Sequence, residues 1–261
     1  MVGLNTHEGT LNTFYQLLEK DYHDWDVAAA PSLITTGGGQ HLVVAAGKDG
    51  HVYGTDRASG RRIYATAVST IENIDAPLTG KGARFCPGVN GGIEWNGPSY
   101  SPRTNLLYVG SVDWCTTLAT HSADQPGKLK GKEALPWTGS NALRAPFGAN
   151  DSTRRGWLTA LDADNGTIKW RYASPTPIIA GVTATAGDVV FTGDLKGDIL
   201  AFDAKDGREL WRYSAGEPIG GGVITYQVGG TEYLAVAVGI NSPVGWKIES
   251  PPAKVLVFKL R

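Results

Sequence analysis

Short runs of apolar and β-branched residues, each closed by a turn signal, recur along the chain. "DVVFTGD" (188–194) is followed by "GDILAFD" (197–203), and the alternation is clearest in "TEYLAVAVG" (231–239). A period of two indicates strands with one buried face, and the Lys-Gly and Asp-Gly pairs between the runs favour tight turns. The pattern therefore predicts an all-β chain of short antiparallel strands.

One sequence motif occurs twice in nearly identical form. "LTALDADNGTIKWRY" (158–172) and "ILAFDAKDGRELWRY" (199–213) share Ala-x-Asp-x-x-x-Gly-x-x-x-Trp and start 41 positions apart. A repeat of roughly 40 residues with Gly and Trp at fixed places is typical of a β-propeller. We expect Trp170 and Trp211 to pack between blades, because an indole is large enough to fill the space between neighbouring sheets.

Two weaker copies of the motif lie upstream. "GTDRASGRRIY" (54–64) has Tyr64 in the Trp place, and "GLNTHEGTLNT" (3–13) has Thr13 there. About four blades follow from this repeat, and the first thirty residues are expected to be the tail of an earlier blade. We expect the blades at 41–66, 92–172, 180–213 and from 220 onward, with 253–260 as the last strand.

The number of blades bears on the domain organisation. Propellers have roughly four to eight blades, and small rings are the minority. The chain is thus expected to be one partial β-propeller domain, residues 1–261, that belongs to a larger ring. A polar stretch without periodicity, at about 116–155, is expected to be a long loop insertion over one face.

Composition narrows the class of function. The 261 residues include 35 Gly and 8 Trp but a single Met, which suits many strands and turns. With 24 basic and 25 acidic residues the net charge is −1, which gives no basic surface for nucleic acid. No apolar run is long enough to span a membrane, and the N-terminal residues lack the pattern of a secretory signal.

An acidic cluster near the N-terminus is the main candidate for chemistry. "DYHDWDVAAAPSL" (21–33) contains Asp21, Asp24 and Asp26. Local spacing leaves three interpretations open: a solvated turn, a metal site, or a base in an active site. Patterns for structural zinc, a serine nucleophile, a phosphate-binding loop and haem attachment are absent, and the five histidines are scattered.

Several stretches resemble the quinoprotein alcohol dehydrogenases, which bind pyrroloquinoline quinone (PQQ) in an eight-bladed propeller. The repeated motif is similar to their tryptophan-docking repeat. The resemblance covers nearly the whole chain but only about the C-terminal half of a family member. The stretches that carry it are "FYQLLEKDYHDWDVAA", "FCPGVNGGIEWNGPSYSPRTNLLYVG" and "TATAGDVVFTGDLKGDILAFDAKDGRELWRY".

The resemblance implies roles for two residues. Asp26 falls at the position of the family's catalytic base, which lies beside a calcium ion and the quinone carbonyl, so it is both the catalytic and the metal candidate. Lys48, in "AAGKDGHVYGTD", falls where a family Lys or Arg binds the quinone oxygens. The alternative for Lys48 is a plain hairpin-turn residue before Asp49-Gly50. Asp21 and Asp24 are expected to be turn residues that hold the loop.

The resemblance also implies a disulfide between Cys86 and Cys115, the only two cysteines, which lie 29 positions apart. The chain departs from the family at Val112, where a PQQ-contacting Asn is expected, and at Ile179, where some members have Trp. The family's calcium-binding Glu and Asn, its adjacent-cysteine ring and its Trp under PQQ all belong to the upstream half.

The expected function is therefore that of the C-terminal half of a periplasmic, PQQ- and Ca²⁺-dependent alcohol dehydrogenase, which oxidises an alcohol and passes electrons to an acceptor protein. The missing N-terminal half, or a second copy of the chain, is expected to complete the ring. The alternative is a non-catalytic propeller module that serves as a scaffold for protein partners.

Overall fold

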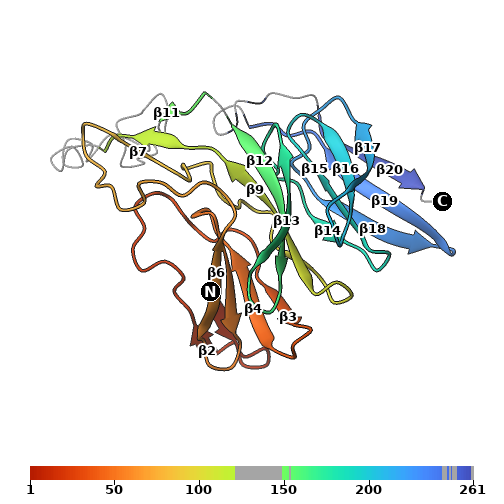
Figure 1. Ribbon diagram of the computed structural model, residues 1–261, viewed down its shortest axis with the longest axis horizontal. Coiled ribbons are helices and arrows are strands. Elements are labelled where there is room, and N and C mark those ends of the chain that lie inside the picture. The colour runs from red at the N-terminus through yellow and green to blue at the C-terminus, as the bar shows by residue number, and fades with distance from the viewer. Residues whose placement is uncertain (121–148, 153, 243–245, 247, 249–251, 260–261) are drawn as a thin grey trace.

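The computed structural model describes residues 1–120, 149–152, 154–242, 246, 248 and 252–259. Within these ranges all regular secondary structure is β, as predicted, and the strands form successive antiparallel sheets (Figure 1). Three sheets have four strands, in the orders β3-β4-β5-β6, β13-β12-β9-β8 and β14-β15-β16-β17, and a fourth has the order β18-β19-β20.

The strand bounds follow the predicted blades closely. The first sheet contains β3 (Ser32–Thr35), β4 (His41–Ala46), β5 (His51–Asp56) and β6 (Arg62–Ala67). The second contains β8 (Ser99–Ser101), β9 (Leu106–Asp113), β12 (Arg155–Asp162) and β13 (Ile168–Ser174). The third contains β14 (Thr183–Ala184), β15 (Val189–Gly193), β16 (Asp198–Asp203) and β17 (Glu209–Ser214). The fourth contains β18 (Val223–Val228), β19 (Thr231–Val238) and β20 (Lys254–Lys259).

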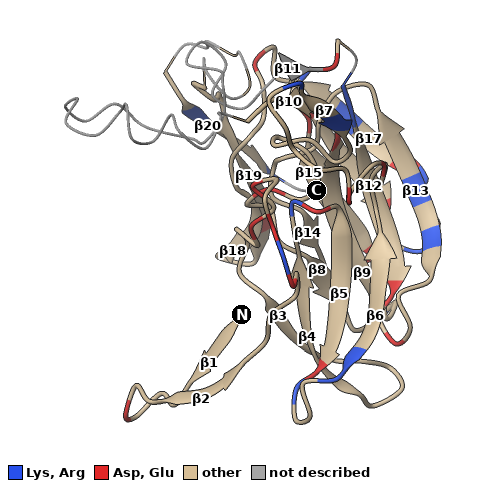
Figure 2. Cartoon of the chain, turned by 90° about the vertical axis from the view of Figure 1, so that its left-hand side faces the viewer, with Lys and Arg blue, Asp and Glu red and all other residues tan. Residues whose placement is uncertain are grey.

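Two smaller sheets complete the described chain. The hairpin of β1 (Val2–Leu4) and β2 (Leu11–Phe14) lies in the stretch that is expected from the sequence to be the tail of an earlier blade. Figure 2 shows it projecting from the other sheets, with charge only at its turn. The second small sheet pairs β7 (Ala83–Phe85) with β10 (Thr116–Leu118), and β10 with β11 (Ala149–Asn150). The two ends of the expected insertion thus pair in this sheet, while 121–148 lie outside the described residues.

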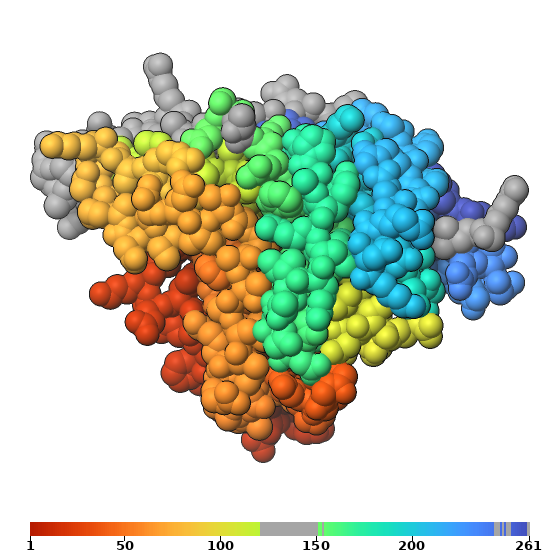
Figure 3. Space-filling model, viewed as in Figure 1, coloured from red at the N-terminus to blue at the C-terminus, as the bar shows by residue number. Residues whose placement is uncertain are grey.

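Hydrophobic cores lie between consecutive sheets, which is the packing of propeller blades. Val44 and Leu107 share the core between the first and second sheets, Leu158 and Phe202 that between the second and third. A third core joins the third and fourth sheets. The outer strands β6, β13 and β17 consequently stand side by side on one face (Figure 3). The chain is a partial β-propeller of about four blades.

An aromatic side chain from one sheet lies on a motif glycine of the next. Gly207 has φ 73°, and a Cβ there would lie 2.5 Å from Cε3 of Trp170, whose Nε1 donates to the carbonyl of Ala204 at 3.1 Å. Trp211 lies edge-on to Phe258 of β20, with ring centroids 5.3 Å apart. Trp170 packs between blades, as expected, whereas Trp211 contacts Phe258 of the next sheet and remains 37% exposed.

The first two motif copies repeat this packing with tyrosines. Tyr64 lies over Gly166, where a Cβ would approach its ring to 2.6 Å. Gly60 is covered by Tyr15, at 2.5 Å from the same imaginary Cβ. The expectation that Thr13 occupies the aromatic place of the first copy is wrong, because Thr13 faces Gly3 across the β1–β2 hairpin and the chain reaches the neighbouring sheet only two residues later.

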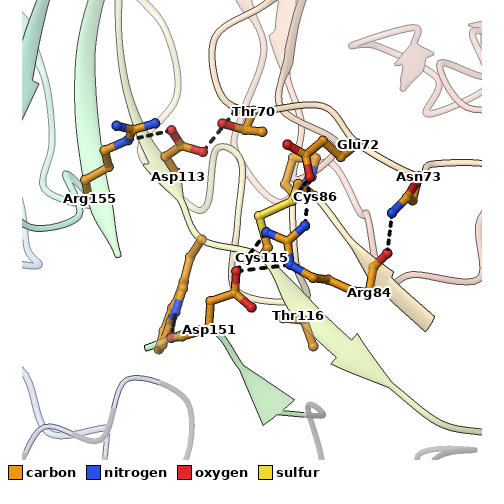
Figure 4. The surroundings of a disulfide bond; sticks show 12 residues. Thr70, Glu72, Asn73, Arg84, Cys86, Asp113, Cys115, Thr116, Asp151 and Arg155 are labelled. Carbon is orange, nitrogen blue, oxygen red and sulfur yellow. Dashed lines mark hydrogen bonds and ion pairs between the residues drawn. A yellow bond between two sulfur atoms is a disulfide. The ribbon is translucent and has the colours of Figure 1, made fainter. Parts of the chain in front are cut away.

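The disulfide between Cys86 and Cys115 is present, as predicted, with Cα atoms 4.5 Å apart. It joins the segment after β7 to the end of β9. Arg84 lies beside it and pairs with Glu72 at 2.7 Å and with Asp151 at 2.8 Å (Figure 4). The ion pairs of Arg84 join β7 to the loop at Glu72 and to Asp151, which follows β11. Among the described residues no helix is long and apolar enough to cross a membrane.

Candidate functional site

Lys48 lies in the tight turn between β4 and β5 and is buried, with 8% of its surface exposed. Its Nζ donates to Oδ2 of Asp24 at 2.9 Å and lies 3.2 Å from Oδ1 of Asp26. The side chain of Asp26 is 61% exposed. The structure thus brings together the two residues that the sequence proposed for the site, and adds Asp24 to them.

The loop that carries the aspartates is held by its own residues. The carboxylate of Asp21 accepts hydrogen bonds from the backbone N–H groups of His23 and Trp25, both at 2.8 Å, so Asp21 is a turn residue as expected. The indole of Trp25 is buried and donates to the carbonyl of Pro87 at 3.1 Å. Asp24 has a left-handed backbone (φ 67°), which suits a turn, yet its carboxylate pairs with Lys48. Describing Asp24 as a turn residue alone is therefore incomplete.

A second segment, 91–96, closes over the Lys48 turn. Gly92 has φ 75°, and a Cβ there would lie 2.2 Å from the carbonyl oxygen of Lys48. The backbone N–H of Ile93 donates to the carbonyl of Gly47 at 3.1 Å. Because only glycine permits this approach, the segment is fixed directly against the turn.

Glu94 follows in this segment and is a site residue that sequence reasoning missed. It is buried, with 8% of its surface exposed, and no hydrogen bond to its carboxyl group is present among the described residues. Burial raises the pKa of Glu94 to about 7, against the lowering effect of Lys48, and the charges of Asp26 and Asp24 raise it further. The available signal was a single acidic residue inside the apolar, glycine-rich stretch "GGIEW".

Trp95 and Asn96 tie the same segment to the later blades. The indole of Trp95 is 46% exposed and donates to the carbonyl of Gly220 at 3.0 Å. The side-chain amide of Asn96 donates to the carbonyls of Gly110 and Ile178 at 3.0 and 3.2 Å. The Glu94 segment therefore contacts the first, second and later sheets at once.

Lys48 keeps its positive charge at neutral pH. Burial alone would lower the pKa of Lys48, but the hydrogen bond to Asp24 and the charges of Glu94, Asp24 and Asp26 outweigh it and leave the pKa above its usual range. The ammonium group stays protonated at neutral pH. An uncommitted donor on such a group can bind an electron-rich oxygen of a ligand.

The two departures from the family pattern are packing residues. Val112 and Ile179 lie fully buried in one hydrophobic cluster with Trp114, Leu195 and Trp246. Their apolar side chains offer no hydrogen bond to a ligand. Among the described residues no group of three or more His, Cys, Asp or Glu side chains could hold a metal ion, so Asp26 has no protein co-ligands there.

Comparisons with known proteins agree with this architecture. Residues 1–77 match the family model "Glucose/ethanol/alcohol dehydrogenase, beta-propeller domain", and residues 154–237 match "Outer membrane protein assembly factor BamB". The quinoprotein ethanol dehydrogenase of Pseudomonas aeruginosa is 30% identical over 93% of the chain and 42% of its own length.

Solved structures extend the likeness to three dimensions. The quinohemoprotein alcohol dehydrogenase of Comamonas testosteroni superposes with a TM-score of 0.75 at 25% identity, over 91% of this chain and 38% of its own. A europium-containing methanol dehydrogenase gives a TM-score of 0.66 at 25% identity, over 84% and 41% of the two chains. The chain spans about two fifths of the length of the relatives it matches. It is thus a relative of the PQQ-dependent alcohol dehydrogenases over nearly its whole length, with a partial propeller of their type.

Proposed function

We propose that the chain is part of a PQQ-dependent alcohol dehydrogenase and supplies one side of its active site. The observation that carries this proposal is the pairing of Lys48 with Asp26, 3.2 Å apart, at the positions that the family resemblance assigns to a quinone-binding cation and a base. The similarity to enzymes named as ethanol, alcohol and methanol dehydrogenases supports an alcohol as the substrate.

Each residue has a defined task in this proposal. Asp26, whose side chain is 61% exposed, accepts the hydroxyl proton of the alcohol at a carboxylate oxygen. Lys48 donates hydrogen bonds to the quinone oxygens and holds Asp26 in place through its second contact. PQQ, when bound, supplies the hydride acceptor.

A metal ion is also expected, with Ca²⁺ as the sequence-based proposal, although one relative is described as containing europium. The described residues do not fit a metal site by themselves, because Asp26 has no neighbouring set of ligands. No step of the reaction is therefore assigned to a metal here. Its remaining ligands would have to come from outside the described residues.

The rest of the assembly is proposed on the same basis. An N-terminal half or a second copy would complete the ring, and an acceptor protein would take the electrons. We place the protein in the periplasm because its only two cysteines form a disulfide, which persists in oxidising compartments.

A scaffold without catalysis is the second candidate. It is favoured by the match of residues 154–237 to the BamB model, which is described as an assembly factor. That segment lies in the second to fourth blades and contains neither Asp26 nor Lys48. Catalysis would therefore require Asp26 and Lys48, whereas a scaffold function of this segment would not.

The test is dye-linked alcohol oxidation with PQQ and Ca²⁺. We expect the chain alone to bind PQQ weakly and to be inactive, and protein extended upstream of Met1 to be active. In that active protein, Asp26→Asn and Lys48→Ala should each remove most of the turnover, while Asp206→Asn, at an exposed turn, should not. An inert extended protein would favour the scaffold instead.

A further inference from the structure

Glu94 differs from every other buried acidic residue that the structure describes. Four of these five side chains have polar partners that offset the cost of burial. Asp49 binds His51 and Tyr53, Asp113 binds Arg155 and Trp157, Asp194 accepts backbone N–H groups and Ser174, and Asp198 pairs with Arg212. Glu94 alone among them has no hydrogen bond or ion pair, and its Oε1 is fully buried.

An unpartnered buried carboxyl group is costly, since leaving a buried polar group unsatisfied destabilises the fold. The cost is not relieved by Lys48, whose ammonium group bonds Asp24 and contacts Asp26 instead. The backbone at Glu94 cannot move away from the Lys48 turn, because Gly92 and Ile93 hold the segment against Gly47 and Lys48. A buried polar group without a partner is retained mostly where the function of the protein uses it.

The position of Glu94 connects it to the proposed site. Its carboxyl group is close enough to Lys48, Asp24 and Asp26 for their charges to act on it, and the next residue is the half-exposed Trp95. We propose that Glu94 is a ligand-contacting residue of the Lys48 site, whose Oε2, which unlike Oε1 is not fully buried, bonds a hydroxyl or carbonyl group of the bound molecule. This inference rests on the proposed function, because it assigns a contact within the same site.

Charge decides which chemical group Glu94 can accept. Three carboxyl groups surround one ammonium group, so the Glu94 side of the site is unfavourable for an anion. A neutral oxygen-bearing group fits there, since a protonated carboxyl group both donates and accepts. The electron-rich part of the ligand is left to Lys48. Glu94 therefore orients the ligand: neutral oxygen atoms face Glu94, and negatively charged groups face Lys48.

The experiment compares Glu94→Gln with two matched variants of the full chain. Asp113→Asn removes a buried carboxylate that has partners, and Glu232→Gln changes an exposed residue on β19. Urea midpoints are measured at pH 8 on the chain without ligand. PQQ binding is followed at pH 6 by quenching of tryptophan fluorescence in the protein extended upstream of Met1, with Glu94→Ala as the binding variant. We expect Glu94→Gln to raise the urea midpoint, and Glu94→Ala to weaken PQQ binding about tenfold or more because it removes both the donor and the acceptor. Asp113→Asn should lower the midpoint, and Glu232→Gln should change neither readout.

The two readouts separate this inference from the function on which it rests. A lowered midpoint for Glu94→Gln, like that of Asp113→Asn, would mean a structural role and overturn the inference whatever PQQ does. Equal PQQ binding by the extended wild type and its Glu94→Ala variant would overturn the inference and leave the proposed function standing, provided that Lys48→Ala weakens binding. No saturable binding by the extended wild-type protein would overturn both.

Discussion

Lys48 and Asp26, 22 positions apart in the sequence, are joined twice: Nζ lies 3.2 Å from Oδ1 of Asp26, and the backbone N–H of Lys48 donates to the Asp26 carbonyl at 3.1 Å. The second bond fixes the loop of aspartates to the β4–β5 turn, independently of side-chain charge. The position of Asp26 is therefore set by the backbone, and the ammonium group can exchange one carboxylate contact for a ligand without releasing the loop.

The disulfide should be fully formed in protein that has never met a reductant. Denatured protein should then show no free thiol on titration, and two thiols per chain would contradict the structure. Replacing both Cys86 and Cys115 by Ser should lower the free energy of unfolding by about 3 kcal/mol, because the bond closes a loop of 29 positions. Urea unfolding of the two proteins measures this difference.

The contact between Trp170 and Gly207 should make this glycine far more sensitive than Gly9. Both have positive φ, 73° and 68°, but a Cβ at Gly207 would strike the indole, whereas nothing lies within 4 Å at Gly9. We expect Gly9→Ala to cost about 1 kcal/mol of stability from backbone strain, and Gly207→Ala about 2–4 kcal/mol. Equal losses in thermal or urea unfolding would show that the indole does not pack there.

The open ends of the arc should drive association. The outer face of the fourth sheet exposes Ile224, Val255 and Val257, and the β1–β2 hairpin exposes Leu11 and Phe14. Exposed sheet faces of this kind pair with other chains, and two copies could close a ring by two-fold symmetry. We expect light scattering to give a dimer, which Val255→Lys with Val257→Lys should weaken. A monodisperse monomer at high concentration, with a closed four-bladed ring, would refute this expectation.

Glu94 should make stability depend on pH in a defined window. Its pKa is about 7 in the folded chain against 4.5 for the free side chain. Below pH 4.5 the group is protonated in both states and has no effect. Between pH 4.5 and 7 the unfolded chain ionises first, so the free energy of unfolding falls as pH rises, by an amount on the order of 3 kcal/mol above pH 7.

Glu94→Gln removes this dependence. The stability difference between the variant and the wild type, measured by urea unfolding at several pH values, should therefore grow across that window and then level off. Glu232→Gln, at an exposed position on β19, is measured beside it as the control. A constant difference for Glu94→Gln would mean that Glu94 ionises normally in the folded chain.

The sequence by itself determined the fold class and the strands, and its resemblance to a known family implied the disulfide. Which residues form strands is decided locally, because hydrophobic alternation and turn glycines such as Gly207 act within a few residues. The repeat of about 40 residues shows the same pattern several times and so strengthens the prediction. The place of Trp170 between two sheets follows from the same repeat. In the weakest copy of the motif, the sequence places Thr13 at the aromatic position. In the structure Tyr15 packs on Gly60 instead, because the position of the neighbouring sheet decides which side chain reaches that glycine.

The candidate site also has a part that the sequence could predict and a part that only the structure reveals. Asp26 and Lys48 could be named from the sequence, because they stand in stretches that resemble a known family. Their contact, the second carboxylate of Asp24, and above all Glu94 were decided only by the tertiary structure. Glu94 lies 46 positions from Lys48, and whether an acid is solvated or buried without a partner depends on what the folded chain packs around it. No local pattern in the sequence carries that information.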